Sequence, residues 1–176
     1  MKNLFIKIIL VVLVINFSSC SKDDENRITS IIGTWELTTW TIGIPMDLND
    51  DGIFHDNLLV ESNCANNETL FFESNGTFSS NLSYNPTVLI HMENNDNENY
   101  IFDVTCDTEG TIGLSGSYEQ NGNEVLLIEK MAILSNNQLT VIYENAIDIY
   151  NEDDDEIVAS RDLTLIYTKK QANLSK

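Results

Sequence analysis

The strongest indication of the fold is one stretch of sequence, Thr69-Leu-Phe-Phe-Glu-Ser-Asn-Gly-Thr-Phe-Ser-Ser80. Threonine and apolar residues flank the polar sequence Ser74-Asn75-Gly76 on both sides. Asn-Gly favours a two-residue hairpin turn of type I′, because both central residues of that turn need a positive φ. We therefore predict a β-hairpin with strands over Thr69–Glu73 and Thr77–Tyr84.

The same texture continues in both directions from this hairpin. Short stretches rich in Thr, Ile, Val, Tyr and Phe alternate with Asn, Asp, Gly and Ser, and Asn121-Gly122 predicts a second hairpin. Beyond the signal-like first residues, no long stretch has helical periodicity. We expect about eight to ten strands. The other predicted strands are Ile31–Ile44, Thr87–Met92, Tyr100–Cys106, Thr111–Glu119, Glu124–Ile128, Gln138–Tyr143 and Asp162–Lys169, with Ala146–Tyr150 as a further candidate.

The strand faces alternate, which predicts an all-β fold with one buried face per strand. Leu139, Val141 and Tyr143 share one face of their strand, and Leu163, Leu165 and Tyr167 share one face of the last strand. Closing such a meander into an antiparallel up-and-down barrel of about eight strands removes its edges and leaves room for side chains or one small ligand. A two-sheet sandwich would use the same alternation.

The N-terminal residues have the order of a secretory signal. Lys2 and Lys7 precede an unbroken apolar run over 8–15, and the small residues Ser18 and Ser19 come directly before Cys20. The apolar run is shorter than the ~20 residues that a membrane span needs. We therefore expect residues 1–19 to be a signal peptide that is removed.

The charge of the chain excludes one class of partner. It carries 28 acidic and 9 basic residues, a formal net charge of −19. Nucleic-acid binding through phosphates needs a basic surface, so we expect no nucleic-acid partner. Solubility is the simplest explanation of the acidity.

Cysteines and histidines give no sign of catalysis. Cys64 and Cys106 remain once Cys20 is set aside, and an exported protein matures under oxidising conditions, so we expect them to form a disulfide. The two histidines, His55 and His91, have no metal-ligand or nucleophile spacing. Hydrolase, zinc-protease and phosphate-loop motifs are absent from the sequence, so we predict no enzymatic activity and name no catalytic residue.

One loop has the pattern of a calcium ligand set. Asp47, Asn49 and Asp51 stand at alternate positions before Gly52, as in the first half of an EF-hand-type loop. The twelfth position holds Leu58 instead of glutamate, and Glu61 follows three residues later. The alternative is an acidic loop with Asx turns and no metal. The acidic run over 152–156 is expected to form a solvated hairpin loop, and its spacing does not support the alternative of a second cation site.

Two short motifs around Cys20 resemble those of known lipoproteins. Phe17-Ser18-Ser19-Cys20 resembles the lipobox of bacterial lipoproteins, in which the new N-terminal cysteine receives acyl chains such as palmitate. Ser21-Lys22-Asp23-Asp24-Glu25 resembles the export signal of surface lipoproteins of Bacteroidota. The resemblance implies lipidation of Cys20 and anchoring in the outer membrane of the cell envelope, facing the exterior.

The remaining chain resembles the lipocalin-like domain found in Bacteroidota lipoproteins. The shared motifs are Ile32-Gly33-Thr34-Trp35-Glu36-Leu37, then Cys64, then Phe72-Glu-Ser-Asn-Gly-Thr-Phe78, then Cys106. The resemblance covers about residues 31–168 and implies an up-and-down barrel that binds a small apolar ligand. It also implies that Trp35 packs at the closed barrel end, with Arg161 as the basic residue that covers it.

These features predict a domain organisation and two alternative functions. The expected parts are the signal peptide 1–19, an acylated flexible tether 20–30, the barrel domain 31–170 and a polar tail 171–176. The first function is a binding module with an apolar cavity. The alternative is a structural or interaction module with a packed barrel, which would contact an envelope protein through its exterior.

Overall fold

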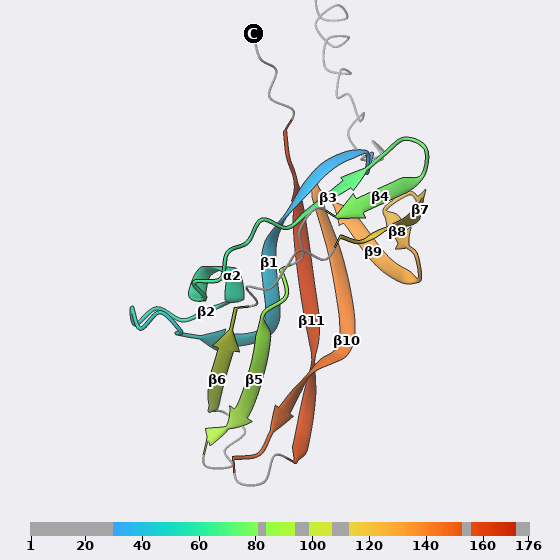
Figure 1. The fold of residues 1–176 in the computed structure, drawn as a ribbon. Coiled ribbons are helices and arrows are strands. Elements are labelled where there is room, and N and C mark those ends of the chain that lie inside the picture. Colours follow the sequence, from blue (N-terminus) through green and yellow to red (C-terminus); the bar gives the residue numbers. More distant parts are fainter. Residues whose placement is uncertain (1–29, 81–83, 94–98, 107–112, 153–155, 172–176) are drawn as a thin grey trace, which may run out of the picture.

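Eight strands close into an antiparallel up-and-down barrel (Figure 1). The computed structural model describes residues 30–80, 84–93, 99–106, 113–152 and 156–171. Consecutive wall strands pair with each other, and the last strand returns to pair with the first. The wall strands are β1 (Gly33–Met46), β3 (Thr69–Phe72), β4 (Thr77–Ser80), β7 (Ser115–Asn121), β8 (Glu124–Leu127), β9 (Lys130–Ser135), β10 (Gln138–Tyr150) and β11 (Ile157–Lys169). The predicted barrel is confirmed, and the sandwich is excluded.

A hairpin is inserted between β4 and β7 and stands outside the barrel wall. β5 (Thr87–Met92) and β6 (Tyr100–Thr105) pair with each other along their full length. β5 also pairs in parallel with the far end of β10, through Ile90 opposite Ile149 and His91 opposite Tyr150. Figure 1 shows this hairpin beside the lower parts of β1, β10 and β11.

A bend in β10 allows this strand to pair both within the barrel wall and with the inserted hairpin. Asn145 has a φ of 49°, and the register with β11 shifts between Tyr143 and Ile147. Asn tolerates this left-handed conformation better than most residues, and the Asn145 amide donates to Asp162 Oδ1 at 2.8 Å. The predicted strands Gln138–Tyr143 and Ala146–Tyr150 are therefore the two halves of one bent strand.

A bulge in β1 changes which residues face the barrel interior. The register with β11 shifts between Leu37 and Thr39. Trp35 and Leu37 are buried before the shift, and Trp40 and Ile42 are buried after it. The bulge therefore lets both tryptophans face inward although they are five positions apart, an odd spacing that a regular strand would place on opposite faces.

The two predicted hairpin turns occur at the predicted positions, but their turn type differs from the predicted type I′. In the first hairpin only Gly76 has a positive φ, whereas a type I′ turn needs two such residues. β9 was missing from the predicted strands. Two left-handed residues, Asn136 and Asn137, form its turn to β10. That Asn-Asn pair was the available signal, because asparagine accepts this conformation.

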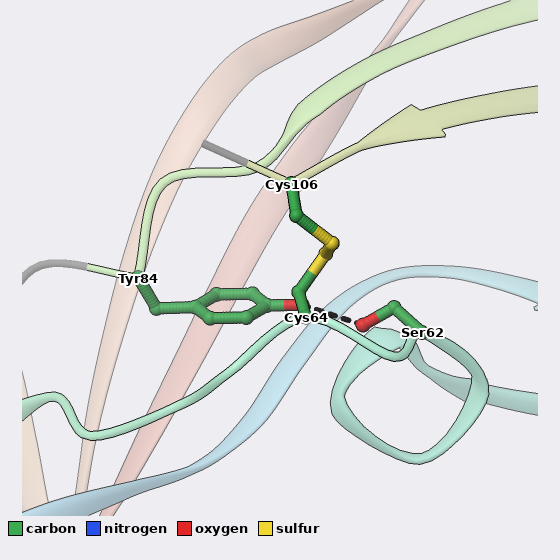
Figure 2. The surroundings of a disulfide bond; sticks show 4 residues. All are labelled: Ser62, Cys64, Tyr84 and Cys106. Atoms are coloured by element: carbon green, nitrogen blue, oxygen red, sulfur yellow. Dashed lines mark hydrogen bonds between the residues drawn. A yellow bond between two sulfur atoms is a disulfide. The ribbon is translucent and has the colours of Figure 1, made fainter. Parts of the chain in front are cut away.

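A disulfide between Cys64 and Cys106 attaches the inserted hairpin to the barrel domain (Figure 2). The Cα atoms are 5.2 Å apart, and the residues are 42 positions apart in sequence. Cys106 directly follows β6, whereas Cys64 lies in the segment between the short helix α2 (Leu58–Glu61) and β3. Beside the bridge, the hydroxyl groups of Ser62 and Tyr84 share a hydrogen bond of 2.8 Å.

Among the described residues no helix has the length and apolar character needed to cross a membrane. The predicted signal peptide, with Cys20, lies outside the described residues.

Candidate ligand-binding site in the barrel

A cavity of about 400 Å³ lies inside the barrel. Inward-facing side chains of several wall strands line it, and most of them are apolar. The apolar lining is Leu70 of β3, Phe78 of β4, Leu127 of β8, Val141 of β10 and Leu165 of β11. The barrel is therefore not filled by its own side chains.

A buried carboxylate forms the polar part of the cavity wall. Glu68 directly precedes β3 and is almost fully buried. Its Oε1 accepts a hydrogen bond from the Tyr167 hydroxyl, and its Oε2 accepts one from the Tyr84 amide at 2.5 Å. These two donors satisfy both oxygens and fix the carboxylate in place.

Burial determines the protonation of this cluster. It raises the pKa of Glu68, although the hydrogen bonds from Tyr167 and Tyr84 act in the opposite direction. Burial, followed by the neighbouring Glu68, raises the pKa of Tyr167, which therefore stays a hydrogen-bond donor. The cavity thus offers a hydrogen-bonded polar group that takes up a proton more readily than an ordinary glutamate.

We expect Glu68→Gln to change how stability depends on pH. Because the folded pKa of Glu68 is raised, its contribution is fully present below the ordinary value of 4.5 and is lost as pH rises through the folded pKa. The free energy of unfolding of wild type should therefore fall relative to the variant as pH rises from 4.5 towards neutrality. Urea denaturation over that range measures the difference.

The informative quantity is the slope of the free energy of unfolding against pH. Glutamine has one hydrogen-bond acceptor fewer than glutamate, which shifts the free energy of unfolding by the same amount at every pH. Glu119→Gln, an exposed change on β7, is the matched control and should leave the slope unaltered. Parallel pH profiles for wild type and Glu68→Gln would contradict the raised pKa.

The rim of the cavity combines a cation with exposed apolar groups. Lys130 at the start of β9 holds its Nζ 5.0 Å from the centre of the Tyr143 ring. Leu114 and Ile128 are exposed on the same rim. Ile128 has a φ of 56°, which β-branched residues rarely adopt. Its side chain covers Gly116, where an added Cβ would approach it to 2.7 Å.

Trp35 has a structural position and does not belong to the cavity lining among the described residues. It is 0% exposed, and its indole Nε1 donates to the Ile31 carbonyl at 2.7 Å. The basic residue above it is Lys169, its register partner on β11, with Nζ 5.4 Å from the ring centre.

The prediction that Arg161 covers Trp35 is wrong. Arg161 lies opposite Ile147, in the part of β11 beyond the bend of β10, eight positions from Lys169. At about 3.4 Å per residue, that spacing places it far from the tryptophan. Arg161 instead lines a second, more polar groove of about 660 Å³, together with Phe54, Tyr100 and Phe102.

The predicted calcium residues lie together in the loop between β1 and β2 (His55–Asn57). Asp47 Oδ1 accepts from the Asp51 amide at 3.1 Å, and Asp47 Oδ2 accepts from the Gly52 amide at 3.0 Å. Asn49 Oδ1 also accepts from the Asp51 amide, at 3.0 Å. The structure thus brings all three predicted residues into one compact turn.

Glu68 and Tyr167 were absent from the predicted site residues. Alternation along the last strand places Tyr167 inward, so that signal existed in the sequence. Glu68 had none, because its burial depends on partners that are distant in sequence.

Comparison with protein families, with curated proteins and with solved structures finds no match to this chain.

Proposed function

We propose that this chain is a lipid-anchored envelope protein of lipocalin-like type whose barrel binds one small, mainly apolar molecule. The observation that carries the proposal is the apolar cavity of about 400 Å³ inside a closed barrel. Its volume lies in the range of about 300–1,000 Å³ typical of small-molecule sites. Eight-stranded barrels are wide enough to hold one such ligand.

The ligand we infer has an apolar body and one polar end. The apolar body would contact Leu70, Phe78 and Val141, which belong to the mainly apolar lining of the cavity. The polar end would lie at Lys130 on the rim or exchange hydrogen bonds with Tyr167 and Glu68. No catalytic step is part of the proposal.

The proposed cellular localisation of the protein rests on the sequence. The lipobox-like sequence before Cys20 and the acidic residues after it support an acyl anchor in the outer membrane, facing the exterior. A ligand-binding barrel at that surface would meet molecules from outside the cell.

Two neighbouring residues of β10 test the cavity. Val141 is 3% exposed and lines the cavity, whereas Ile142 is 44% exposed and faces outward. Val141→Phe should fill the cavity and weaken binding of 1-anilinonaphthalene-8-sulfonate, a fluorescent probe with an aromatic body and one anionic group, by about tenfold, the factor that about 1.4 kcal/mol represents. Ile142→Phe should leave probe affinity unchanged.

Each variant is compared at equal folded fraction, verified by circular dichroism. Equal probe affinity in wild type and both variants would contradict binding in the cavity. Native mass spectrometry of the full chain, purified gently from its source, would then identify a retained small molecule.

The competing hypothesis is an interaction module with a packed barrel. A packed barrel has no room for a cavity of this size, so the geometry favours the binding module. A retained protein partner in place of a small molecule, seen by the same mass spectrometry, would favour the interaction module.

A further inference from the structure

The loop over 47–53 is built from side chains that accept backbone hydrogen bonds. Besides the bonds from Asp47 and Asn49, Asp51 Oδ1 accepts from the Ile53 amide at 2.8 Å. These are Asx turns, which form with or without a metal ion. The turn alone therefore does not distinguish a calcium loop from an ordinary acidic loop.

Glu61 provides an independent observation. It ends α2, yet its side chain is only 1% exposed. Its Oε2 accepts a hydrogen bond from the amide of Leu48 at 3.1 Å. Leu48 stands between Asp47 and Asn49 in sequence, so this bond places the Glu61 carboxylate against the loop. Its Oε1 is buried and has no hydrogen-bond partner among the described residues.

An unpartnered carboxylate oxygen in the interior is energetically costly. Buried charges are normally paired or bound to metal, because desolvation otherwise outweighs the remaining interactions. No lysine or arginine of the described residues forms an ion pair with Glu61. The nearby acids Asp47, Asp50 and Asp51 add negative charge instead of offsetting it.

Strand pairing explains how Glu61 reaches the loop. β2 runs back along β1, with Asn57 opposite Thr41 and His55 opposite Met46. The Asn57 side chain then caps α2 by accepting from the Leu59 amide at 3.2 Å. This return places α2 beside the start of the loop, so that Glu61 is near Asp47 despite the missing acid at Leu58.

We propose that Asp47, Asn49, Asp51 and Glu61 form a calcium site. The side-chain oxygens of the first three occupy the first, third and fifth positions of the loop, and the Ile53 carbonyl occupies the seventh. Glu61 Oε1 supplies the closing ligand that the twelfth position lacks. Calcium suits this set better than magnesium, because it accepts six to eight oxygens in flexible geometry.

The ion would also rearrange the loop. Within the described residues, no three acidic, histidine or cysteine side chains converge on one point. Binding is therefore expected to draw the carboxylates of Asp47 and Asp51 towards Glu61 while keeping the backbone turn.

Calcium chloride added to the purified full chain tests the proposal. Isothermal titration calorimetry should detect one site with a dissociation constant of about 10⁻⁴ M, within the range of extracellular calcium modules. The melting temperature should rise by about 4 °C at ten times that concentration, and chelator should reverse the rise.

Glu61→Gln is the decisive variant, since it keeps the shape and the acceptor for the Leu48 amide but removes the charge. It should weaken calcium binding at least tenfold, and so should Asp51→Asn. Glu119→Gln, with the same chemical change on exposed β7, should bind calcium like wild type.

The melting temperature without calcium shows that each variant is folded. A wild-type melting temperature indifferent to millimolar calcium and to chelator would overturn the site. Undiminished calcium affinity in folded Glu61→Gln would overturn the role of Glu61.

Discussion

Replacing both Cys64 and Cys106 with serine is expected to lower the free energy of unfolding by about 2–4 kcal/mol. The bridge joins residues 42 positions apart, and in the chain-entropy model a closed loop of that size contributes up to about 4 kcal/mol. Urea denaturation of wild type and of the double variant, both without reductant, measures the loss.

The position of the bridge predicts where the loss of order is greatest. Among the described residues, the inserted hairpin pairs with the barrel strands through two register positions of β10. Without the disulfide, the link from Cys106 to the segment after α2 is lost. Hydrogen exchange should therefore accelerate in β5 and β6 more than in β3 or β11.

Tyr84→Phe distinguishes the contribution of the disulfide from that of its surroundings. It removes only the hydrogen bond to Ser62 beside the disulfide. It should cost about 1 kcal/mol, the typical net value of one hydrogen bond. Two free thiols in peptide maps of the non-reduced wild type, or equal stability of wild type and double variant, would contradict the prediction.

The barrel could be predicted because its evidence is local. Alternating faces and turn residues such as Gly76 and Gly122 act within a few positions of sequence. The inserted hairpin could not be recognised, because β5 and β6 have the same alternation as wall strands. Which strands pair is decided by long-range contacts that the local pattern does not encode.

β9 shows how a local pattern can mislead. Met131, Ala132, Ile133 and Leu134 are all apolar, so the strand lacks a polar face. Ala132 and Leu134 face the core, whereas Met131 and Ile133 are half exposed. A continuous apolar run gives no period of two, and the strand was missed for that reason.

The burial and the contacts of the two carboxylates of interest were beyond local prediction for the same physical reason. Glu68 is held by Tyr167, which lies 99 positions away. Glu61 touches the loop only because β2 pairs with β1. Among 28 acidic residues, nothing in the sequence distinguishes Glu68, and Glu61 is distinguished only by its position three residues after the end of the calcium-loop pattern.

The exchange of Arg161 for Lys169 over Trp35 is a matter of register. Both are basic and both belong to the last strand, so the sequence alone does not choose between them. Pairing of Trp35 with Lys169 makes that choice, and the lysine also donates to the Ser30 carbonyl at 2.6 Å. Lys169 thereby holds Ser30, which precedes β1, at the end of the barrel where Trp35 lies.

Cys20→Ala is expected to abolish membrane anchoring of the protein. If Cys20 carries acyl chains, each buried CH₂ contributes about 0.8 kcal/mol, and two or more chains give stable attachment. Wild type should partition into the detergent phase of a temperature-induced phase separation, and Cys20→Ala should remain in the aqueous phase or stay unprocessed. The intact mass of wild type should correspond to the chain without residues 1–19 and with the acyl groups added.

The Cys64→Ser, Cys106→Ser double variant provides the matched control, because it removes two cysteines but keeps the anchor. It should still enter the detergent phase. Wild-type protein in the aqueous phase would contradict the lipid anchor.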